Sequence, residues 1–375
     1  MNYKIRIVFF IALSGLLPCS CKYPYQPSQF ILPSPNFIFP SKSDIQNFVG
    51  FANVKLAFTL TTTVSNVYFL DYNNYNDSAF LPLQLKKPKG MESFNCARSR
   101  ISPDGSFVAY YLTAGATING AYIQRLDTAA TPVLVDANGT EPHWWQDSSG
   151  GVYIIYSNVI LVPTTGGINK NIGQTFKRKV DLTGNGSVSG TALVIAPYPM
   201  NGGLSADGQY LCTGYESAAF YNIFDSTLIP IDQGFQTCNP SIDPDTAHPG
   251  WMMFLNFKGV QNMNNPFIGA ADYPDSFIVE HSVLFIVDYT NTVRDYVPLS
   301  LLNAAGYGGY SEWQTPEWSN NPQFAAALGV INDNQADGII IKNVGNHAAT
   351  KAFLKFTLGK GKLNLESRPY IWIGK

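Results

Sequence analysis

Charged and amide side chains recur beside a short pattern that the chain repeats six times. They stand either directly before a copy of the pattern or at its second residue: Arg98, Arg100, Glu141, His143, Asn201, Asn239, Glu317 and Arg368. Arginine donates paired hydrogen bonds to carboxylates, and amides supply both donors and acceptors. Brought together, these residues could bind a carboxylate or the end of a peptide. The alternative is a set of solvated residues that neutralise one another around a water-filled channel.

Residue types that usually carry catalysis form no recognisable constellation. The histidines (His143, His248, His281 and His347) show no i, i+4 pairing and no Cys or Glu at metal-ligand spacing. Residues 181–192 resemble the start of a calcium loop but end at Ala192, where an acidic ligand is needed, so a glycine-rich hairpin turn is favoured. No G-x-S-x-G elbow of a serine hydrolase is present. We predict no catalytic residue, no metal site and no cofactor.

The repeated pattern has an apolar third residue and ends in a turn former. Its copies are SRISPD (99–104), PHWWQD (142–147), GGLSAD (202–207), PSIDPD (240–245), PEWSNN (316–321) and a partial PYIWIG (369–374). A strand-like run follows each of the first five copies, as expected of a hairpin turn. Further strands are predicted at 121–126, 157–163, 219–224 and 283–289, so each unit has room for four strands. We attribute the longest spacing between copies to an insertion at 258–276.

The last copy ends with the chain and has no following strand. Its partners are available near the other terminus, at 54–60, 65–72 and 80–85. A sheet built from both ends closes a ring and removes exposed strand edges. The predicted fold is therefore all-β, a six-bladed β-propeller of four-stranded antiparallel blades, closed by pairing of the N-terminal strands with the C-terminal strand.

The copies in register resemble the TolB-type, WD-like propeller repeat, P-x-W-S-P-D-G followed by an alternating strand. The resemblance covers nearly the whole chain from residue 46 on, and the N-terminal α/β domain of TolB has no counterpart here. It implies a six-bladed β-propeller. The innermost strand of each blade would border the central channel, so the charged and amide residues above become candidates for a binding site at the channel mouth. Trp144, Trp145, Trp318 and Trp372 are expected to pack between blades.

The N-terminus carries a targeting segment. Lys4 and Arg6 precede a short apolar run that is too brief to span a bilayer. The following PCSC resembles a loose lipobox, which implies a bacterial lipoprotein acylated at Cys21. Pro18 departs from the usual pattern, and an ordinary secretory signal, or acylation at Cys19, is the alternative. Three cysteines remain: Cys96, Cys212 and Cys238. An odd number cannot pair fully within the chain, and buried free thiols are at least as plausible as one disulfide between two of them.

Three segments follow from these observations. Residues 1–20 are the predicted lipoprotein signal peptide, residues 21–45 a proline-rich tether, and residues 46–375 the propeller. We expect an exported, lipid-anchored protein of the bacterial cell envelope, at the outer membrane, facing the periplasm or the cell surface. The net charge of −2 and the lack of long Lys/Arg runs exclude an electrostatic footprint for nucleic acid.

The leading functional hypothesis is a non-enzymatic binding or scaffold module for an envelope protein, peptide or glycan, because no catalytic constellation is visible. The alternative is a metal-assisted, lactonase-like hydrolase in which Glu141, Glu317, Asn201 and Asn239 converge on an ion in the channel. Convergence of their oxygen atoms would favour the enzyme, and a scattered ring would favour the binder. A structural lipoprotein whose partners contact only its edges is a third alternative.

Overall fold

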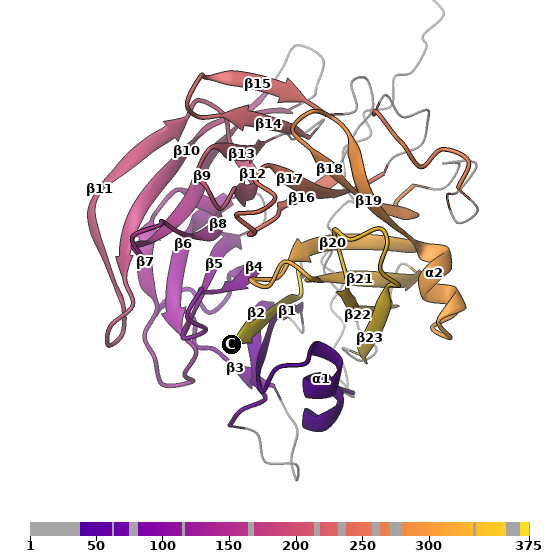
Figure 1. Ribbon diagram of the computed structural model, residues 1–375. Helices are drawn as coiled ribbons and strands as arrows, with labels where there is room; N and C mark the ends of the chain where they lie inside the picture. Colours follow the sequence, from indigo (N-terminus) through magenta and orange to yellow (C-terminus); the bar gives the residue numbers. More distant parts are fainter. Residues whose placement is uncertain are drawn as a thin grey trace, which may run out of the picture.

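Six four-stranded antiparallel sheets surround a central axis in the computed structural model (Figure 1). The structure describes residues 38–374 except 62–63, 75–81, 115–116, 164–168, 214–217, 232–237, 257–262, 271–272, 274–279, 333–334 and 358–367. The predicted six-bladed β-propeller is confirmed. Among the described residues, neither helix has the length and apolar composition needed to cross a membrane.

Each sheet is one blade, numbered here from the N-terminus and given from the innermost strand outward. Blade 1 contains β24 (Tyr370–Gly374), β1 (Asn53–Thr61), β2 (Ser65–Asp71) and β3 (Leu83–Gln84). Blade 2 contains β4 (Asn95–Ile101), β5 (Phe107–Ala114), β6 (Thr117–Arg125) and β7 (Val133–Asp136). Blade 3 contains β8 (Gly139–Gln146), β9 (Val152–Pro163), β10 (Asn169–Asp181) and β11 (Ser187–Ala196).

The second half of the ring follows the same order. Blade 4 contains β12 (Met200–Leu204), β13 (Tyr210–Thr213), β14 (Ala219–Asn222) and β15 (Thr227–Pro230). Blade 5 contains β16 (Cys238–Ile242), β17 (Trp251–Leu255), β18 (Val283–Asp288) and β19 (Val293–Pro298). Blade 6 contains β20 (Glu312–Trp318), β21 (Phe324–Asn332), β22 (Gln335–Lys342) and β23 (Ala352–Thr357). Every copy of the repeated pattern therefore overlaps an innermost strand.

The ring closes between the two ends of the chain, as the sequence predicts. β24 pairs antiparallel with β1 from Asn53↔Gly374 to Ala57↔Tyr370. The long spacing before the fifth copy is confirmed as a single blade, because β17 leads to β18 through residues 256–282, whose described parts hold no strand of the sheet. One local expectation is wrong: residues 157–163 continue β9 without a break, and the third strand of blade 3 is β10.

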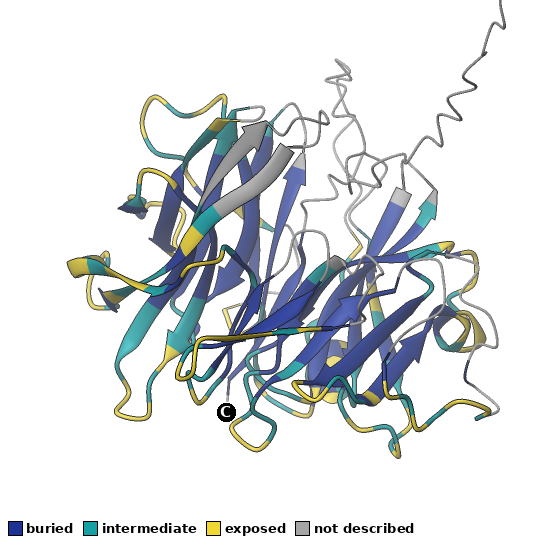
Figure 2. Ribbon diagram, turned by 90° about the horizontal axis from the view of Figure 1, so that it is seen from above, coloured by how far each residue is buried: buried dark blue, intermediate teal, exposed yellow. Residues whose placement is uncertain are grey.

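The core consists of six apolar layers, one between each pair of neighbouring blades. β5 shows how one strand serves two layers: Val108 and Tyr110 pack against blade 1, and Ala109 and Tyr111 pack against blade 3. Successive side chains on a strand point to opposite faces, so alternation distributes them between the layers. Figure 2 shows buried inner strands, with exposure in the loops and in outermost strands such as β11 and β15.

Two short helices accompany the sheets. α1 (Lys42–Val49) begins at Ser41, whose side chain accepts a hydrogen bond from the Asp44 N–H at 3.1 Å, and it buries Ile45 and Val49 in the layer between blades 6 and 1. α2 (Leu299–Ala304) follows β19. The packed body thus includes residues from Ile38 onward, whereas the predicted signal peptide, Cys21 and the first part of the predicted tether lie outside the described residues.

Two tryptophans at the fourth position of the pattern join neighbouring blades, as expected for inter-blade packing. Trp372 of blade 1 donates from Nε1 to the Pro103 carbonyl of blade 2 at 3.0 Å. Trp145 of blade 3 donates in the same way to the Ser205 carbonyl of blade 4 at 2.9 Å. Each ring also covers the glycine of the neighbouring turn, Gly105 or Gly208. This contact explains why the S-x-D-G turn ends in glycine at these two blades.

We expect Gly105→Ala to destabilise the protein by about 2 kcal/mol more than Gly50→Ala. The two glycines have φ values of +75° and +79°, so the backbone cost is matched. At Gly105 a Cβ would lie 2.5 Å from the Trp372 ring, whereas nothing lies within 4 Å of a Cβ at Gly50. Urea unfolding followed by tryptophan fluorescence measures the difference, and equal midpoints for the two variants would contradict this role of Trp372.

Candidate functional site: a charged cluster in the propeller channel

A β-bulge interrupts the innermost strand at the same place in five blades. The pairing shifts after Ala97, Thr140, Met200, Cys238 and Gln314, always just before or within the start of the repeated pattern. Bulges bend a strand and redirect side chains, and they are frequent beside functional sites. The recurrence shows that the residues before the pattern share one special backbone position.

Four of these positions have a left-handed backbone despite carrying a side chain. Arg98, Glu141, Asn239 and Thr315 have φ values of 55°, 51°, 50° and 45°. A non-glycine residue in this region costs about 1–2 kcal/mol, and such strained residues cluster where the surrounding structure uses them. Four equivalent outliers in one ring therefore mark the channel as a candidate site.

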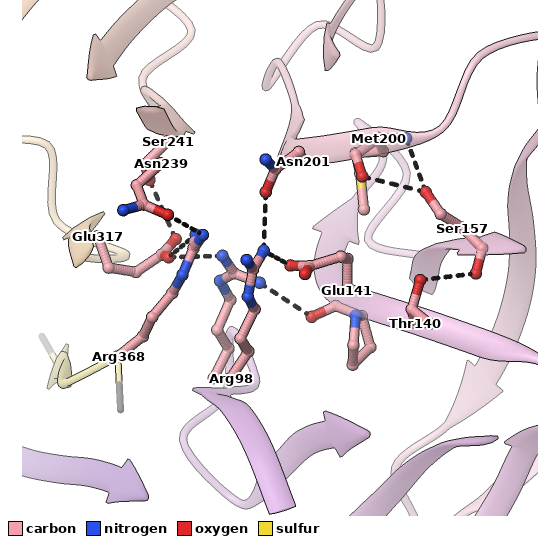
Figure 3. A network of polar contacts seen from close by, with 12 residues as sticks. Arg98, Thr140, Glu141, Ser157, Met200, Asn201, Asn239, Ser241, Glu317 and Arg368 are labelled. Atoms are coloured by element: carbon pink, nitrogen blue, oxygen red, sulfur yellow. Dashed lines mark hydrogen bonds and ion pairs between the residues drawn. The ribbon is translucent and has the colours of Figure 1, made fainter. Parts of the chain in front are cut away.

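Seven of the eight predicted site residues, all except His143, are hydrogen-bond or ion-pair partners of one another, and Figure 3 shows most of these contacts. Arg98 forms an ion pair with Glu141 and donates from Nη1 to Asn201 Oδ1 at 2.7 Å. These three residues come from blades 2, 3 and 4. Arg368 of blade 1 donates from Nη2 to Asn239 Oδ1 of blade 5 at 2.9 Å.

Glu317 is the centre of the second half of the cluster. Its Oε2 accepts a hydrogen bond from Arg100 Nη2 at 2.5 Å and lies 3.5 Å from Arg368 Nη1. Its Oε1 accepts from Ser241 Oγ at 3.0 Å. Ser241 Oγ in turn accepts from the Trp318 N–H at 2.9 Å, which fixes the hydroxyl. One carboxylate thus holds two guanidinium groups from opposite parts of the sequence.

A backbone acceptor that sequence reasoning missed completes the environment of Arg100. Its Nη1 donates to the Pro142 carbonyl at 3.2 Å, and the Arg100 carbonyl accepts from Trp144 Nε1 at 2.8 Å. The sequence does place Pro142 at the first position of its pattern copy, next to the predicted site residues Glu141 and His143. Only the bulge geometry, however, shows that its carbonyl faces the neighbouring blade.

His143 is a neutral member of the cluster. Its side chain is buried, and its Nε2 has no hydrogen-bond partner in the part of the chain that the structure describes. Burial, together with the positive charges of Arg100, Arg368 and Arg98, holds the pKa of His143 well below its usual range. The ring fits only because residue 203 is glycine, where a Cβ would lie 2.8 Å from His143 Nδ1.

The five ionised residues leave one positive charge in excess. Three arginines (Arg98, Arg100 and Arg368) face two carboxylates (Glu141 and Glu317), and all five are at least nine-tenths buried. A buried charge is stable only when it is paired and hydrogen-bonded. The sequence left open that these residues neutralise one another around a water-filled channel. The pairing of arginines with carboxylates agrees with that alternative, but the residues are buried rather than solvated.

We expect His143 to make the protein less stable as the pH falls from about 7.5 to 5. Because the folded pKa is depressed, the unfolded chain binds a proton near pH 6.5 that the folded chain does not bind. Stability is therefore full above pH 6.5 and is lost below it. Urea midpoints at several pH values should depend less on pH in His143→Gln than in the parent protein. An equal slope in the parent protein and in His143→Gln would contradict the assignment.

The oxygen atoms required by the hydrolase alternative serve other partners. Glu141 and Glu317 pair with arginines, and the Oδ1 atoms of Asn201 and Asn239 accept from Arg98 and Arg368. Within the described ranges, no group of three or more His, Cys, Asp or Glu is arranged to hold a metal ion. Glu141 and Asn201 thus share Arg98, and Glu317 and Asn239 share Arg368.

The remaining sequence candidates are not hydrogen-bonded to the channel cluster in any contact between described residues. Residues 181–187 form the turn between β10 and β11, as favoured over a calcium loop. His248 stacks on Trp251 with ring centroids 4.0 Å apart, and His347 lies 3.6 Å from Asp295. Cys96 and Cys212 are buried free thiols. Burial raises the pKa of Cys96 to about 12, so this thiol is unreactive.

Similar folds occur in other proteins, although no protein-family model and no curated protein sequence matches this chain. TolB from Acinetobacter baumannii superposes with a TM-score of 0.50 at 12% identity, covering 88% of this chain and 70% of that chain. AztD from Citrobacter koseri gives a TM-score of 0.38 at 9% identity, covering 86% of this chain and 98% of that chain.

A lectin is also among the similar structures. The Aleuria aurantia lectin AAL, in complex with Fucα1-6GlcNAc, gives a TM-score of 0.38 at 12% identity, covering 81% of this chain and 95% of that chain. Identities this low carry information on fold alone. The ring of six sheets, its closure by β24 and the superposition on TolB agree. The chain folds as a TolB-type six-bladed β-propeller.

Proposed function

We propose that this chain is a non-enzymatic binding module that takes a carboxylate-bearing protein, peptide or glycan at the propeller channel. The observation that carries the proposal is the ring of strained, bulged positions from which Arg98, Glu141 and Asn239 reach the channel cluster. A purely structural ring could be built from unstrained apolar strands at lower cost. The strain therefore supports selection for the charged side chains themselves.

The chemistry of the cluster favours a ligand that carries negative charge. Three guanidinium groups exceed two carboxylates, and His143 adds a ring nitrogen without removing charge. An incoming carboxylate would balance the excess charge and compete with Glu141 or Glu317 for guanidinium donors. Because these internal carboxylates already occupy the arginines, we expect moderate affinity and ready release.

The cellular setting belongs to the same proposal. The predicted signal peptide and Cys21 support export and a lipid anchor in the bacterial cell envelope, which would hold the propeller near envelope partners. Cys21→Ser should release the protein from the membrane fraction, and mass spectrometry of the purified N-terminal peptide should detect acyl chains on Cys21 in the parent protein.

A peptide and glycan titration tests the channel. Short peptides with a free C-terminal carboxylate, the same peptides as C-terminal amides, and uronic-acid oligosaccharides are titrated while tryptophan fluorescence is recorded. We expect acids to bind and amides to bind at least about tenfold more weakly. Arg98→Gln should reduce acid binding, whereas Arg125→Gln, on the exposed end of β6, should not. Equal binding of acids and amides, or equal loss in both variants, would refute the proposal.

A further inference from the structure

A second concave region lies between blades 1 and 2 and shares no lining residue with the channel cluster. Its volume is about 660 Å³. One wall comes from the start of β2 and from β3, the other from the β6–β7 connection around Ala129 and Pro132, and the segment from Lys86 to Glu92 runs along it. This volume lies in the range of sites that bind small ligands or a few residues of a peptide.

Positive charge dominates the lining of this cleft. Three lysines (Lys86, Lys87 and Lys89) line it, and among the described lining residues Glu92 is the one acidic side chain. The Glu92 carboxylate accepts a hydrogen bond from the Gly90 N–H at 3.1 Å, and backbone hydrogen bonds of this kind lower the pKa of Glu92. The Glu92 carboxylate is thus engaged within its own loop, in a chain whose net charge is −2.

The lysines divide into one that shapes the loop and two that face solvent. Lys87 donates from Nζ to the carbonyls of Phe94 at 2.5 Å and Glu92 at 3.2 Å, and burial lowers its pKa. Lys87 therefore holds the segment in a fixed shape. Lys86 and Lys89 are exposed on either side of it and can pair with an incoming anion at little reorganisation cost.

We propose that the cleft between blades 1 and 2 binds an acidic, extended peptide segment of a partner protein. Charge complementarity supplies the first argument, because three lysines face a single carboxylate, Glu92, among the lining residues that the structure describes. Its apolar floor, which includes Val64 and Leu85, supplies the second, because it suits the aliphatic parts of a peptide. The side chain of Gln84 accepts from Tyr68 through Oε1, which leaves its amide nitrogen as a further donor.

Other anionic macromolecules fit the cleft less well. Recognition of an anionic membrane by a basic segment uses a cluster of about 4–8 Lys or Arg on a convex or extended surface. Here only two exposed lysines line a concave cleft. Single-stranded nucleic acid requires aromatic platforms for its bases, and the cleft has no aromatic lining residue within the described ranges.

Fluorescence anisotropy with a labelled eight-residue peptide of alternating Glu and Val tests the proposal on the purified protein. The peptide carries a C-terminal amide, which removes the terminal carboxylate that the proposed channel site would bind. We expect salt-sensitive binding that falls about fivefold in Lys86→Glu and in Lys89→Glu, and further in the double variant. Lys42→Glu on α1 makes the same charge change elsewhere and should reduce binding less than twofold. Circular dichroism confirms that all the variants are folded.

Three outcomes would overturn the assignment. The Gln–Val analogue could bind as well as the Glu–Val peptide, or Lys42→Glu could weaken binding as much as the cleft variants. Vesicles with anionic lipids could instead bind with the same dependence on Lys86 and Lys89, which would identify a lipid surface. The channel variant Arg98→Gln should retain Glu–Val binding, so the test separates this cleft from the proposed channel function.

Discussion

Deletion of residues 369–375 is expected to abolish the stable monomeric propeller. The deletion removes β24, which pairs with β1 along five residues and buries Ile371, Trp372 and Ile373. Loss of a large buried side chain costs about 2–5 kcal/mol, so losing several approaches the 5–15 kcal/mol total of an ordinary domain. It also exposes the edge of β1, a template for aggregation. Size-exclusion chromatography and urea unfolding measure both effects.

A peptide complementation experiment provides the control for this deletion. Excess synthetic peptide of residues 368–374 should restore the monomer and part of the urea midpoint, because it can replace the missing strand. Deletion of Lys375 alone should change neither measurement. A monomeric truncated protein with the parental midpoint would show that the closure by β24 contributes little.

Glu317→Gln is expected to destabilise the protein by about 3–5 kcal/mol, because it leaves Arg100 and Arg368 buried without their shared carboxylate. The amide keeps the size of the side chain and one acceptor oxygen, so the loss reports charge rather than packing. Urea unfolding measures the change. Glu92→Gln, which replaces an exposed carboxylate, should leave the urea midpoint nearly unchanged.

A double variant separates pairing from other effects of Glu317. Adding Arg100→Met to Glu317→Gln removes one of the two guanidinium groups that have lost their shared carboxylate, so the double variant should be more stable than the sum of the single effects predicts. Strict additivity would mean that Arg100 and Glu317 do not interact in solution, despite their 2.5 Å hydrogen bond.

Ring closure was predictable because its determinants are local and repeated. Each copy of the pattern encodes an apolar residue, a turn and a following strand, and six copies with a strand left over at the end imply closure at the start. By contrast, β10 and α2 were not recognised. β10 has the polar sequence NKNIGQTFKRKVD, and its strand state depends on pairing with β9 and β11 rather than on its own pattern.

The sequence by itself determined the number of blades, their order, and the eight residues that would approach the axis. Only the tertiary structure decided what these residues do there. Arg100 and Glu317 are separated by 217 positions in the chain, so their pairing depends on the placement of blades 2 and 6 around the ring. The left-handed bulges likewise arise where strand pairing, channel packing and charge must be satisfied together. Local sequence propensity does not describe strand pairing between blades, packing in the channel or charge pairing. The burial of the candidate residues and their near neutralisation are therefore properties of the folded structure.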